Sequence, residues 1–396
     1  MNGLPRTRLL FLISSLHIGG AERHTLSLTN NLDTSRFDIS LCYLKRDETL
    51  LPQVMLDRMQ SVFCVDARSG LDLAALGRVV REVERLAIDA IVCANPYSML
   101  YGLLARWRSP RQLKVVEVYH TTILGSRRER LQMSFYRSLF RITDMLVYVC
   151  NNQRDYWRQR GLRARAERVI HNGVDVEHFS DRYSSADKAA VRAEFGFSAN
   201  DYVIGICSAL RPEKAHGDLV EALAGVKRLG LKARCLIIGD GSERESIEAT
   251  AARLQVQADV RIAGYREDVR PYIAACDVMV MPSHAIETFS LAALESMALG
   301  KPLVMSRIGG ADEQVRDGEN GFLFSPGDVG ALIGHLVTLA DPVKRASMGE
   351  SAMAIVRRDF SSPRMVEAYS SMFDELLHPR DNNLHARAAP RTQEAK

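Results

Sequence analysis

Short apolar runs alternate with longer amphipathic stretches along most of the chain, and the alternation falls into two series. The first series predicts strands at 9–15, 39–44, 62–66, 90–93, 113–120 and 145–149, with helices that are clearest at 71–88 and 127–141. The second predicts strands at 203–209, 235–239, 260–264, 278–282 and 302–306, and helices at 218–229, 243–254, 291–299 and 330–339. Apolar runs without alternation are typical of strands buried on both faces. The pattern therefore predicts an α/β protein.

The order of these elements predicts the fold. Alternation of strand and helix implies parallel sheets joined by right-handed crossovers. The two series meet near His171-Asn172-Gly173-Val174-Asp175, which is followed by a polar stretch to about residue 200. We predict two tandem doubly wound, Rossmann-like domains over 1–175 and 176–358, a helix over 359–377 and a disordered tail over 378–396. Two such domains place a ligand-binding cleft between the C-terminal ends of their strands.

Composition and charge narrow the class of partner. The chain has 396 residues, of which 46% are hydrophobic and 25% charged, the balance of a soluble globular protein. Residues 1–175 hold 26 Lys and Arg against 17 Asp and Glu, and residues 100–170 hold 15 against 5. A basic half indicates an anionic partner, either a membrane surface, a phosphate-bearing substrate or nucleic acid. No nucleic-acid motif is present and aromatics are 7%, so we expect no nucleic acid partner.

Cysteine usage and the N-terminal run bear on the compartment. The seven cysteines include no C-x-x-C pair, which favours reduced thiols in a cytoplasmic protein over disulfides or zinc. The apolar run at 9–16 is too short for a membrane span and leads into a glycine turn. We therefore expect a cytoplasmic protein that is peripheral at the inner face of the membrane. No D-x-D motif occurs, and we expect no metal and no other cofactor.

The strongest candidate site is the loop after the predicted strand 278–282. It contains Glu287 and leads into a helix that we expect to begin near Phe289. The first N–H groups of a helix have no partner within it and lie at the positive end of its dipole, which suits a diphosphate. Glu295 follows on an apolar face of this helix. A buried carboxylate needs hydrogen-bond donors, which either two ligand hydroxyls or a backbone group or arginine of the protein would supply.

Three more segments place polar residues or glycines where predicted strands end. Arg211 and Lys214 follow the first strand of the second series, where they neutralise phosphate or form an exposed basic turn. Gly19-Gly20 follows the first strand of the chain, and glycine lets a ligand approach the backbone. His120 ends the fifth strand, where it either faces the predicted cleft or is a hydrogen-bonded core histidine.

The segment 126–141 predicts a basic amphipathic helix. One face carries Leu131, Phe135, Leu139 and Ile142, and arginines lie on another. Basic charge beside apolar side chains is typical of a helix on an anionic membrane surface. A helix that packs on its own sheet has the same pattern, so both interpretations stay open.

The residues singled out above belong to a longer set of motifs in a fixed order. The set comprises Gly19-Gly20-Ala21-Glu22, Asn172-Gly173-Val174-Asp175, Arg211-Pro212-Glu213-Lys214, Gly239-Asp240-Gly241, Gly264-Tyr265, Glu287-x7-Glu295, Gly300-Lys301-Pro302, Gly309-Gly310 and Asp317-Gly318-Glu319-Asn320-Gly321-Phe322. The ordered set, which spans residues 9 to 374, resembles the retaining glycosyltransferases of family 4. That resemblance implies the GT-B fold, in which two Rossmann-like domains face each other across a cleft.

The resemblance also implies the donor site. The donor would be a nucleotide-sugar, with a UDP-sugar favoured over a GDP-sugar, bound mainly by the C-terminal domain. Glu295 would hold the ribose hydroxyls and Glu287 the hydroxyls of the donor sugar. Lys214 and Arg211 would stabilise the leaving diphosphate, together with backbone N–H groups in the segment Thr288-Phe289-Ser290.

Other residues receive roles from the same resemblance. Gly264 and Tyr265 would face the base. His120 and Gly19-Gly20 would come from the N-terminal, acceptor-binding domain, and the helix after Ser361 would cross back to that domain. The catalytic residues implied in this way are Glu287, His120 and Lys214.

Two departures from the family pattern bear on the donor. The family often has an arginine five residues before the lysine of its Pro-Glu-Lys element, whereas here the arginine is Arg211, three residues before Lys214, and Ser208-Ala209-Leu210 replaces Gly-Arg-Leu. The family's Glu-Gly-Phe-Gly is here Glu287-Thr288-Phe289-Ser290, and the loss of both glycines narrows the conformations open to the loop.

The first hypothesis is a retaining glycosyltransferase of bacterial surface polysaccharide or glycolipid synthesis, with a glycan or lipid-linked acceptor. Retention would follow from front-face attack assisted by the leaving phosphate, and no metal would be required. A nucleotide-sugar epimerase or hydrolase on the same fold would convert the donor without an acceptor. A glycan- or nucleotide-binding subunit would bind without turnover, and the fold alone does not separate these hypotheses.

Overall fold

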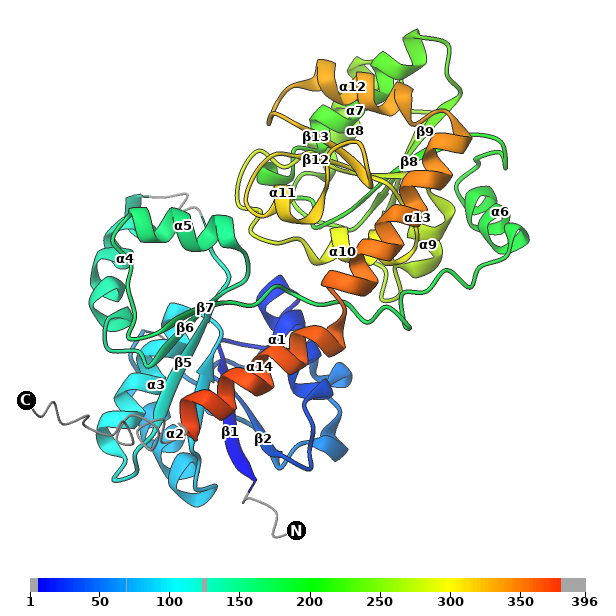
Figure 1. Cartoon of the computed structure of the whole chain (residues 1–396). Helices are drawn as coiled ribbons and strands as arrows, with labels where there is room; N and C mark the ends of the chain where they lie inside the picture. Colours follow the sequence, from blue (N-terminus) through cyan, green and yellow to red (C-terminus); the bar gives the residue numbers. More distant parts are fainter. Residues whose placement is uncertain (1–5, 69, 123–126, 379–396) are drawn as a thin grey trace, which may run out of the picture.

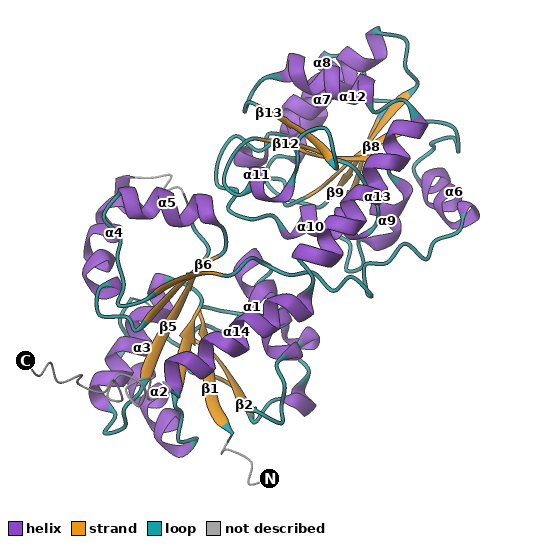
Figure 2. Cartoon of the chain, in the orientation of Figure 1, coloured by secondary structure: helices purple, strands orange, loops and turns teal. Residues whose placement is uncertain are grey.

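The chain folds into two α/β lobes that are joined by two connecting segments (Figure 1). The computed structural model describes residues 6–68, 70–122 and 127–378, with the backbone alone at 127–130. From residue 379 on, the predicted tail at 378–396 lies outside the described residues. Each lobe is built on its own parallel sheet (Figure 2), which is the arrangement of the GT-B fold.

The N-terminal lobe has, within the described residues, seven parallel strands in the order β3-β2-β1-β4-β5-β6-β7. In β1 (Thr7–Ile13), Leu9 and Phe11 pack into one apolar core and Leu10 and Leu12 into another. Successive strand side chains point to opposite faces, so a strand covered on both sides is apolar throughout. The remaining strands are β2 (Phe37–Tyr43), β3 (Ser61–Cys64), β4 (Ala90–Cys93), β5 (Lys114–Tyr119), β6 (Met145–Tyr148) and β7 (Glu167–Val169).

Polar caps fix the start of the helices between these strands. Asp72 accepts hydrogen bonds from the N–H groups of Ala74 and Ala75, and Asn95 accepts one from Ser98. The helical elements of this lobe are α1 (Gly20–Asn31), η1 (Leu51–Gln53), η2 (Leu56–Arg58), α2 (Leu73–Arg85), α3 (Pro96–Arg108), α4 (Arg127–Phe140) and α5 (Asn151–Gln159).

The C-terminal lobe repeats the architecture with six described strands in the order β10-β9-β8-β11-β12-β13, all of whose pairs are parallel. The strands are β8 (Tyr202–Cys207), β9 (Ala233–Ile238), β10 (Val260–Gly264), β11 (Val278–Met281), β12 (Leu303–Ser306) and β13 (Gly321–Phe324). The helical elements are α6 (Ser185–Glu194), η3 (Pro212–Lys214), α7 (His216–Arg228), α8 (Arg244–Arg253), α9 (Arg270–Ala275), α10 (Leu291–Ala298), α11 (Ala311–Gln314), α12 (Val329–Thr338) and α13 (Pro342–Asp359).

The last helix, α14 (Ser362–Leu377), lies against the N-terminal lobe beside α1 (Figure 1). The chain therefore passes between the lobes twice, and the two passages pair through a bridge between Val174 and Ser361. A Cβ on Gly173 would stand 2.9 Å from the Ser361 carbonyl oxygen, so this close approach requires glycine. Phe373 of α14 packs on Phe37 with ring centroids 5.9 Å apart.

Strand order places the ends of particular strands at the middle of the molecule. In each sheet the winding reverses once, between β1 and β4 in the first and between β8 and β11 in the second. Loops that follow strands at such reversal points form the ligand site of open α/β sheets. The segments after β1, β8 and β11 carry Gly19-Gly20, Lys214 and Glu287.

The structure differs from the sequence prediction at the sheet edges and in α4. β7 and β13, of three and four residues, were not predicted. In α4 the predicted apolar face divides: Leu139 is buried, whereas the side chains of Leu131 and Phe135 are 76% and 58% exposed. The inner face of α4 instead includes Met133 and Phe140. Among the helices of residues 6–68, 70–122 and 127–378, none combines the length and apolar character of a membrane span.

Candidate active site

The loop between β11 and α10 is buried over Thr288-Phe289-Ser290, where the two lobes meet, whereas His284 and Ile286 are exposed. Glu287 lies in this loop, as expected, and α10 begins at Leu291, as the periodicity predicted, rather than nearer Phe289. Ser290 is the cap, and its Oγ accepts a hydrogen bond from the Ala293 N–H at 3.3 Å. The Ser290 N–H itself donates to Gln314 Oε1 at 3.2 Å. In the first turn of α10, the N–H groups of Leu291 and Ala292 are therefore the ones left for an anion.

Thr288 joins this loop to the N-terminal lobe. The Thr122 hydroxyl donates to the Thr288 hydroxyl at 2.9 Å, which in turn donates to the backbone carbonyl of His120 at 2.8 Å. The Asn172 side chain donates to the carbonyl of Phe289 at 2.9 Å. The segment Thr288-Phe289-Ser290 and His120, which lie far apart in the sequence, are thus in contact in the structure.

A glycine turn supports the same loop from behind. The Gly310 N–H donates to the Thr288 carbonyl at 2.7 Å. Gly309 has a φ of +56°, and a Cβ there would stand 1.8 Å from the carbonyl oxygen of Glu287. No other residue type fits this contact, so the motif Gly309-Gly310 holds the backbone around Glu287 in place.

Lys214 and Glu287 form an ion pair within the C-terminal lobe. The Lys214 ammonium lies 2.6 Å from Glu287 Oε2, and the Ser283 hydroxyl donates to the same oxygen at 3.3 Å. The neighbours Ala215 and Ile286 have φ values of +52° and +57°, a left-handed conformation that costs non-glycine residues about 1–3 kcal/mol each. Such strain is tolerated where the fold holds two reactive side chains in a set position.

The structure separates the two cations that follow β8. Lys214 is half-buried beside Glu287, whereas Arg211 is exposed, and within the described residues its side chain makes no hydrogen bond or ion pair. The predicted contact between Arg211 and a phosphate remains a prediction.

Glu295 is the most deeply buried charged group of the candidate site, with 3% of its surface exposed. Its Oε1 pairs with the guanidinium of Arg23, which reaches across from α1 of the other lobe. Its Oε2 has no hydrogen-bond partner in the described chain. Burial raises the pKa of Glu295, and the attraction of Arg23 opposes that rise. The sequence left open whether ligand hydroxyls or a group of the protein would donate hydrogen bonds to Glu295. In the structure the donor is an arginine of the protein, Arg23.

His120 follows β5 and lies under the Thr288 loop. Its ring packs edge-on against His24 of α1 at a centroid distance of 4.9 Å. His24 Nε2 lies 3.4 Å from the hydroxyl of Tyr369 on α14. Burial lowers the pKa of His120 to about 4 and that of His24 well below its ordinary value, so both rings are neutral at pH 7. The Nε2 atom of His120 is buried without a partner in the described chain.

Glu313 of α11 forms a further connection between the lobes, and sequence reasoning missed it. Its carboxylate accepts hydrogen bonds from the N–H groups of Asn151 and Asn152 at 3.0 and 2.9 Å, which caps α5. His171 Nε2 lies 2.8 Å from the same group. Burial acts to raise the pKa of Glu313, but these hydrogen bonds outweigh it and lower the pKa to about 2. Its partners are more than 140 residues away, so no local pattern identifies it.

The remaining predicted residues lie around this centre. Gly19 caps α1 with extended backbone, and Gly20 begins the helix. Gly264 ends β10 in a left-handed conformation with φ +77°, and Tyr265 after it is exposed. Within the described chain, no cluster of three or more His, Cys, Asp or Glu side chains is placed to hold a metal ion.

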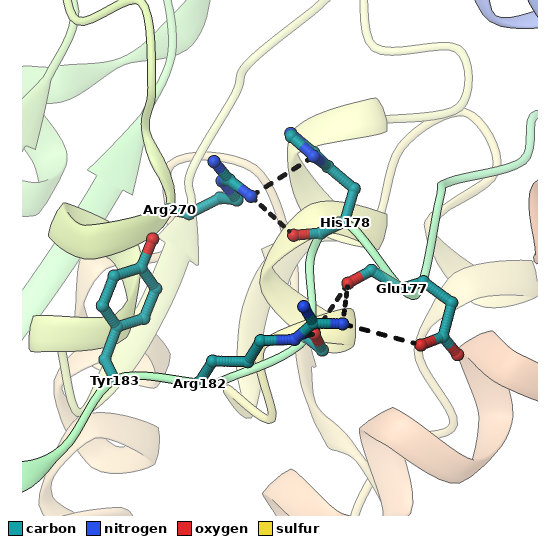
Figure 3. Close-up of a pocket in the computed structure, with 6 residues that line it drawn as sticks. Glu177, His178, Arg182, Tyr183 and Arg270 are labelled. Carbon is teal, nitrogen blue, oxygen red and sulfur yellow. Dashed lines mark hydrogen bonds and ion pairs between the residues drawn. The ribbon is translucent and has the colours of Figure 1, made fainter.

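A pocket of about 380 Å³ opens beside the segment that connects the lobes (Figure 3). It is lined by Glu177, His178, Ser180, Arg182, Tyr183 and Arg270. Arg270 donates to the carbonyl of His178 at 3.0 Å, which ties α9 to the connecting segment. None of the predicted site residues lines this pocket.

Comparison with known proteins agrees with this geometry. Residues 18–178 match the family model described as Glycosyltransferase Family 4, and residues 187–354 match the model described as Glycosyl transferases group 1. The chain is 26% identical to the N-acetyl-alpha-D-glucosaminyl L-malate synthase of Bacillus anthracis, over 79% of this chain and 81% of that protein. It is 32% identical to the lipopolysaccharide core biosynthesis glycosyltransferase LpsE of Rhizobium meliloti, over 59% of this chain and 64% of LpsE.

Among solved structures, Anabaena HepE in complex with UDP superimposes with a TM-score of 0.80 and 26% identity. The match covers 93% of this chain and 100% of HepE. HepE in complex with UDP and glucose superimposes with a TM-score of 0.82 and 25% identity over the same shares.

Proposed function

Because the chain belongs to the family 4 glycosyltransferases, we propose that it transfers a sugar from a UDP-sugar, or next in order a GDP-sugar, with retention of configuration. The observation that carries the proposal is the ion pair of Lys214 and Glu287 beside the start of α10. A diphosphate needs cations and N–H donors, and a sugar needs acceptors for its hydroxyls. This site supplies both within one loop cluster.

The donor would bind at the C-terminal ends of β8 and β11. Lys214 would turn from Glu287 to the diphosphate, and Glu287 would then accept hydrogen bonds from the donor sugar. The Leu291 and Ala292 N–H groups and the dipole of α10 would face the leaving group. Glu295 would hold the ribose hydroxyls, and Gly264 and Tyr265 would lie toward the base. HepE, which binds UDP in the solved complexes, supports a uridine nucleotide.

The reaction proposed is front-face substitution at the anomeric carbon. The bond between this carbon and the diphosphate oxygen breaks, a bond to the acceptor oxygen forms on the same face, and the acceptor proton passes to the departing phosphate. Lys214 and the helix N–H groups stabilise the charge that develops on the leaving group without a metal. The neutral ring of His120 lines the acceptor side, and the contacts of Thr288 close the site against water.

The acceptor side belongs to the N-terminal lobe. We propose a glycan or lipid-linked acceptor at the inner face of a bacterial membrane, where surface polysaccharide or glycolipid is made. Arginines cluster in and around α4, and Leu131 and Phe135 of this helix are exposed. Cationic and apolar side chains on one helix favour contact with anionic lipid.

A thermal-shift panel of UDP-, GDP- and ADP-sugars tests the donor. A ligand that binds the native state raises its melting temperature, and we expect the largest rise with a UDP-sugar. The donor that binds is then incubated with the enzyme, EDTA and candidate acceptors, and the anomeric configuration of the product is read by NMR. Donor hydrolysis that is independent of acceptor, or inversion of configuration, would contradict the proposal. If no nucleotide-sugar changed the melting temperature, the proposed donor site would be refuted.

A further inference from the structure

Two pairs of opposite charge occupy the proposed donor site. One is Lys214 with Glu287 in the C-terminal lobe. The other is Arg23 with Glu295, and it joins the lobes. Arg23 stands in the first turn of α1, directly after the motif Gly19-Gly20-Ala21-Glu22, and no motif identified it.

The surroundings of Glu295 show what happens to this pair when a nucleotide enters. Its carboxylate has one partner, Arg23, and its Oε2 is buried with its acceptor capacity unused. A ribose has two adjacent hydroxyl groups, so it satisfies both oxygens of a carboxylate. This step rests on the proposed function, in which Glu295 binds the ribose. The ribose hydroxyl would then displace the Arg23 guanidinium from Oε1.

A displaced guanidinium in this position stays close to the bound nucleotide. Arg23 lies where the lobes meet, within ion-pair distance of Glu295, and its side chain is 39% exposed, so it is free to turn to another anion. In a nucleoside diphosphate the phosphates are attached to the ribose that Glu295 would hold, so the nearest new anion is the diphosphate. The planar guanidinium is suited to bind two of its oxygens.

Arg23 is a candidate for the second cation that a diphosphate needs beside Lys214. A diphosphate in a nucleotide-sugar carries two negative charges, and Lys214 supplies one positive charge. Arg211 points to solvent, and Ala209 stands five residues before Lys214, where the family often has arginine. Among the side chains described here, Arg23 is the arginine that already pairs with a donor-site carboxylate from the opposite lobe.

We propose that Arg23 is a diphosphate-binding residue, and that donor binding replaces the Arg23–Glu295 pair by Glu295–ribose and Arg23–diphosphate contacts. The N-terminal lobe thereby contacts the phosphates directly. A bare nucleoside does not make this contact, so Arg23 should favour UDP over uridine.

Calorimetric titration of UDP and of uridine separates the role of the phosphates from that of the nucleoside. For Arg23→Gln we expect UDP to bind roughly 10- to 100-fold more weakly, the effect of losing a charged hydrogen-bond donor. Uridine should bind to Arg23→Gln at least as tightly as to the wild type, because no guanidinium then competes with the ribose for Glu295. Arg23→Lys keeps the charge but not the planar fork, and should give an intermediate loss for UDP alone. GDP and guanosine replace the uridine pair if the wild type binds GDP instead.

Arg36→Gln is the matched control, because Arg36 pairs with Asp374 on the surface at 2.6 Å and lies outside the donor site. It should bind UDP and uridine as the wild type does. If Arg23→Gln binds both ligands more tightly, Arg23 only competes with the nucleotide and the inference is overturned. Equal weakening of both ligands in Arg23→Lys and Arg23→Gln would show a structural role and also overturn it. A wild type that binds none of the four ligands would instead refute the proposed function.

Discussion

The hydroxyl of Thr122 lies 2.9 Å from the hydroxyl of Thr288, and the two side chains belong to different lobes. The Thr288 hydroxyl in turn donates a hydrogen bond to the backbone carbonyl of His120. The loop that carries Glu287 is therefore positioned by the N-terminal lobe as well as by its own sheet. The proposed donor and acceptor halves of the site are joined at this point.

Thr288→Val removes this connection with little change of shape. Each lost hydrogen bond costs about 1 kcal/mol, and misplacement of the loop should lower kcat/KM by about tenfold or more. Thr122→Val should have a smaller effect, because Thr288 keeps its bond to His120. Thr338→Val, which removes a hydroxyl bonded only within α12, is the control. Thermal unfolding and transfer kinetics that are unchanged in Thr288→Val would refute the connection.

Lys214→Ala tests the proposed stabilisation of the leaving group. It should lower kcat by roughly 100- to 1000-fold, as the loss of a charge-stabilising group in other enzymes does. Glu295→Ala should chiefly weaken donor binding, because its contact would be with the ribose. Lys227→Ala is the control. The Lys227 ammonium lies 2.5 Å from the Asp259 carboxylate, and this ion pair is outside the proposed site. Wild-type turnover in Lys214→Ala and Glu295→Ala would defeat the site assignment.

Glu313→Gln tests the connection that Glu313 makes between the lobes. A carboxyl group whose pKa is lowered to about 2 in the folded chain adds stability above pH 4.5, which is lost as the pH falls toward 2. The substitution should therefore lower the free energy of unfolding at pH 7 by about 1–2 kcal/mol, discounted for partial exposure. Glu319→Gln, at an exposed ion pair, should have no effect. Equal melting temperatures of Glu313→Gln and wild type at pH 7 would count against the connection.

Glu117 on β5 should make stability depend on pH in the opposite sense. It is completely buried, neither carboxylate oxygen has a partner in the described chain, and burial raises its pKa well above the ordinary value. Its stability contribution is present below about pH 4.5 and is lost as the pH rises through the folded pKa. Denaturation at pH 5 to 8 should show Glu117→Gln gaining on the wild type by up to about 1.4 kcal/mol per pH unit.

Glu84→Gln is the comparison for this series, because Glu84 is exposed on α2. Its unfolding free energy should follow the wild type at every pH. A constant difference between Glu117→Gln and the wild type over the whole range would show that Glu117 is ionised in the folded protein.

The exposed apolar residues of α4 test the proposed membrane contact. The double variant Leu131→Ser and Phe135→Ser should lose most of its co-sedimentation with phosphatidylglycerol vesicles, because both side chains would enter the lipid interface. Binding of the wild type should weaken as salt rises. Val343→Ser removes a side chain that is equally exposed on α13 and should bind as the wild type. If the double variant bound vesicles as the wild type does, the proposed membrane contact through α4 would be refuted.

Much of the site was predictable because its residues follow strands. Runs such as 203–209 and 278–282 are apolar on both faces, so their ends, and with them Lys214 and Glu287, could be located from the sequence. The helix predicted over 291–299 is α10, and Ser290 is its cap. The predicted face of α4 was wrong in part, since the inner side includes Met133 and Phe140.

The sequence by itself determined the two series of strands and helices, the parallel sheets and the loops that carry the candidate site residues. These follow from local periodicity and from burial, which each segment encodes without reference to its partners. Only the tertiary structure decided that Arg23 pairs with Glu295, that Glu313 caps α5 and that Thr288 bonds to Thr122. Such pairs join residues more than 150 positions apart, and their contact depends on how two separately encoded lobes come together.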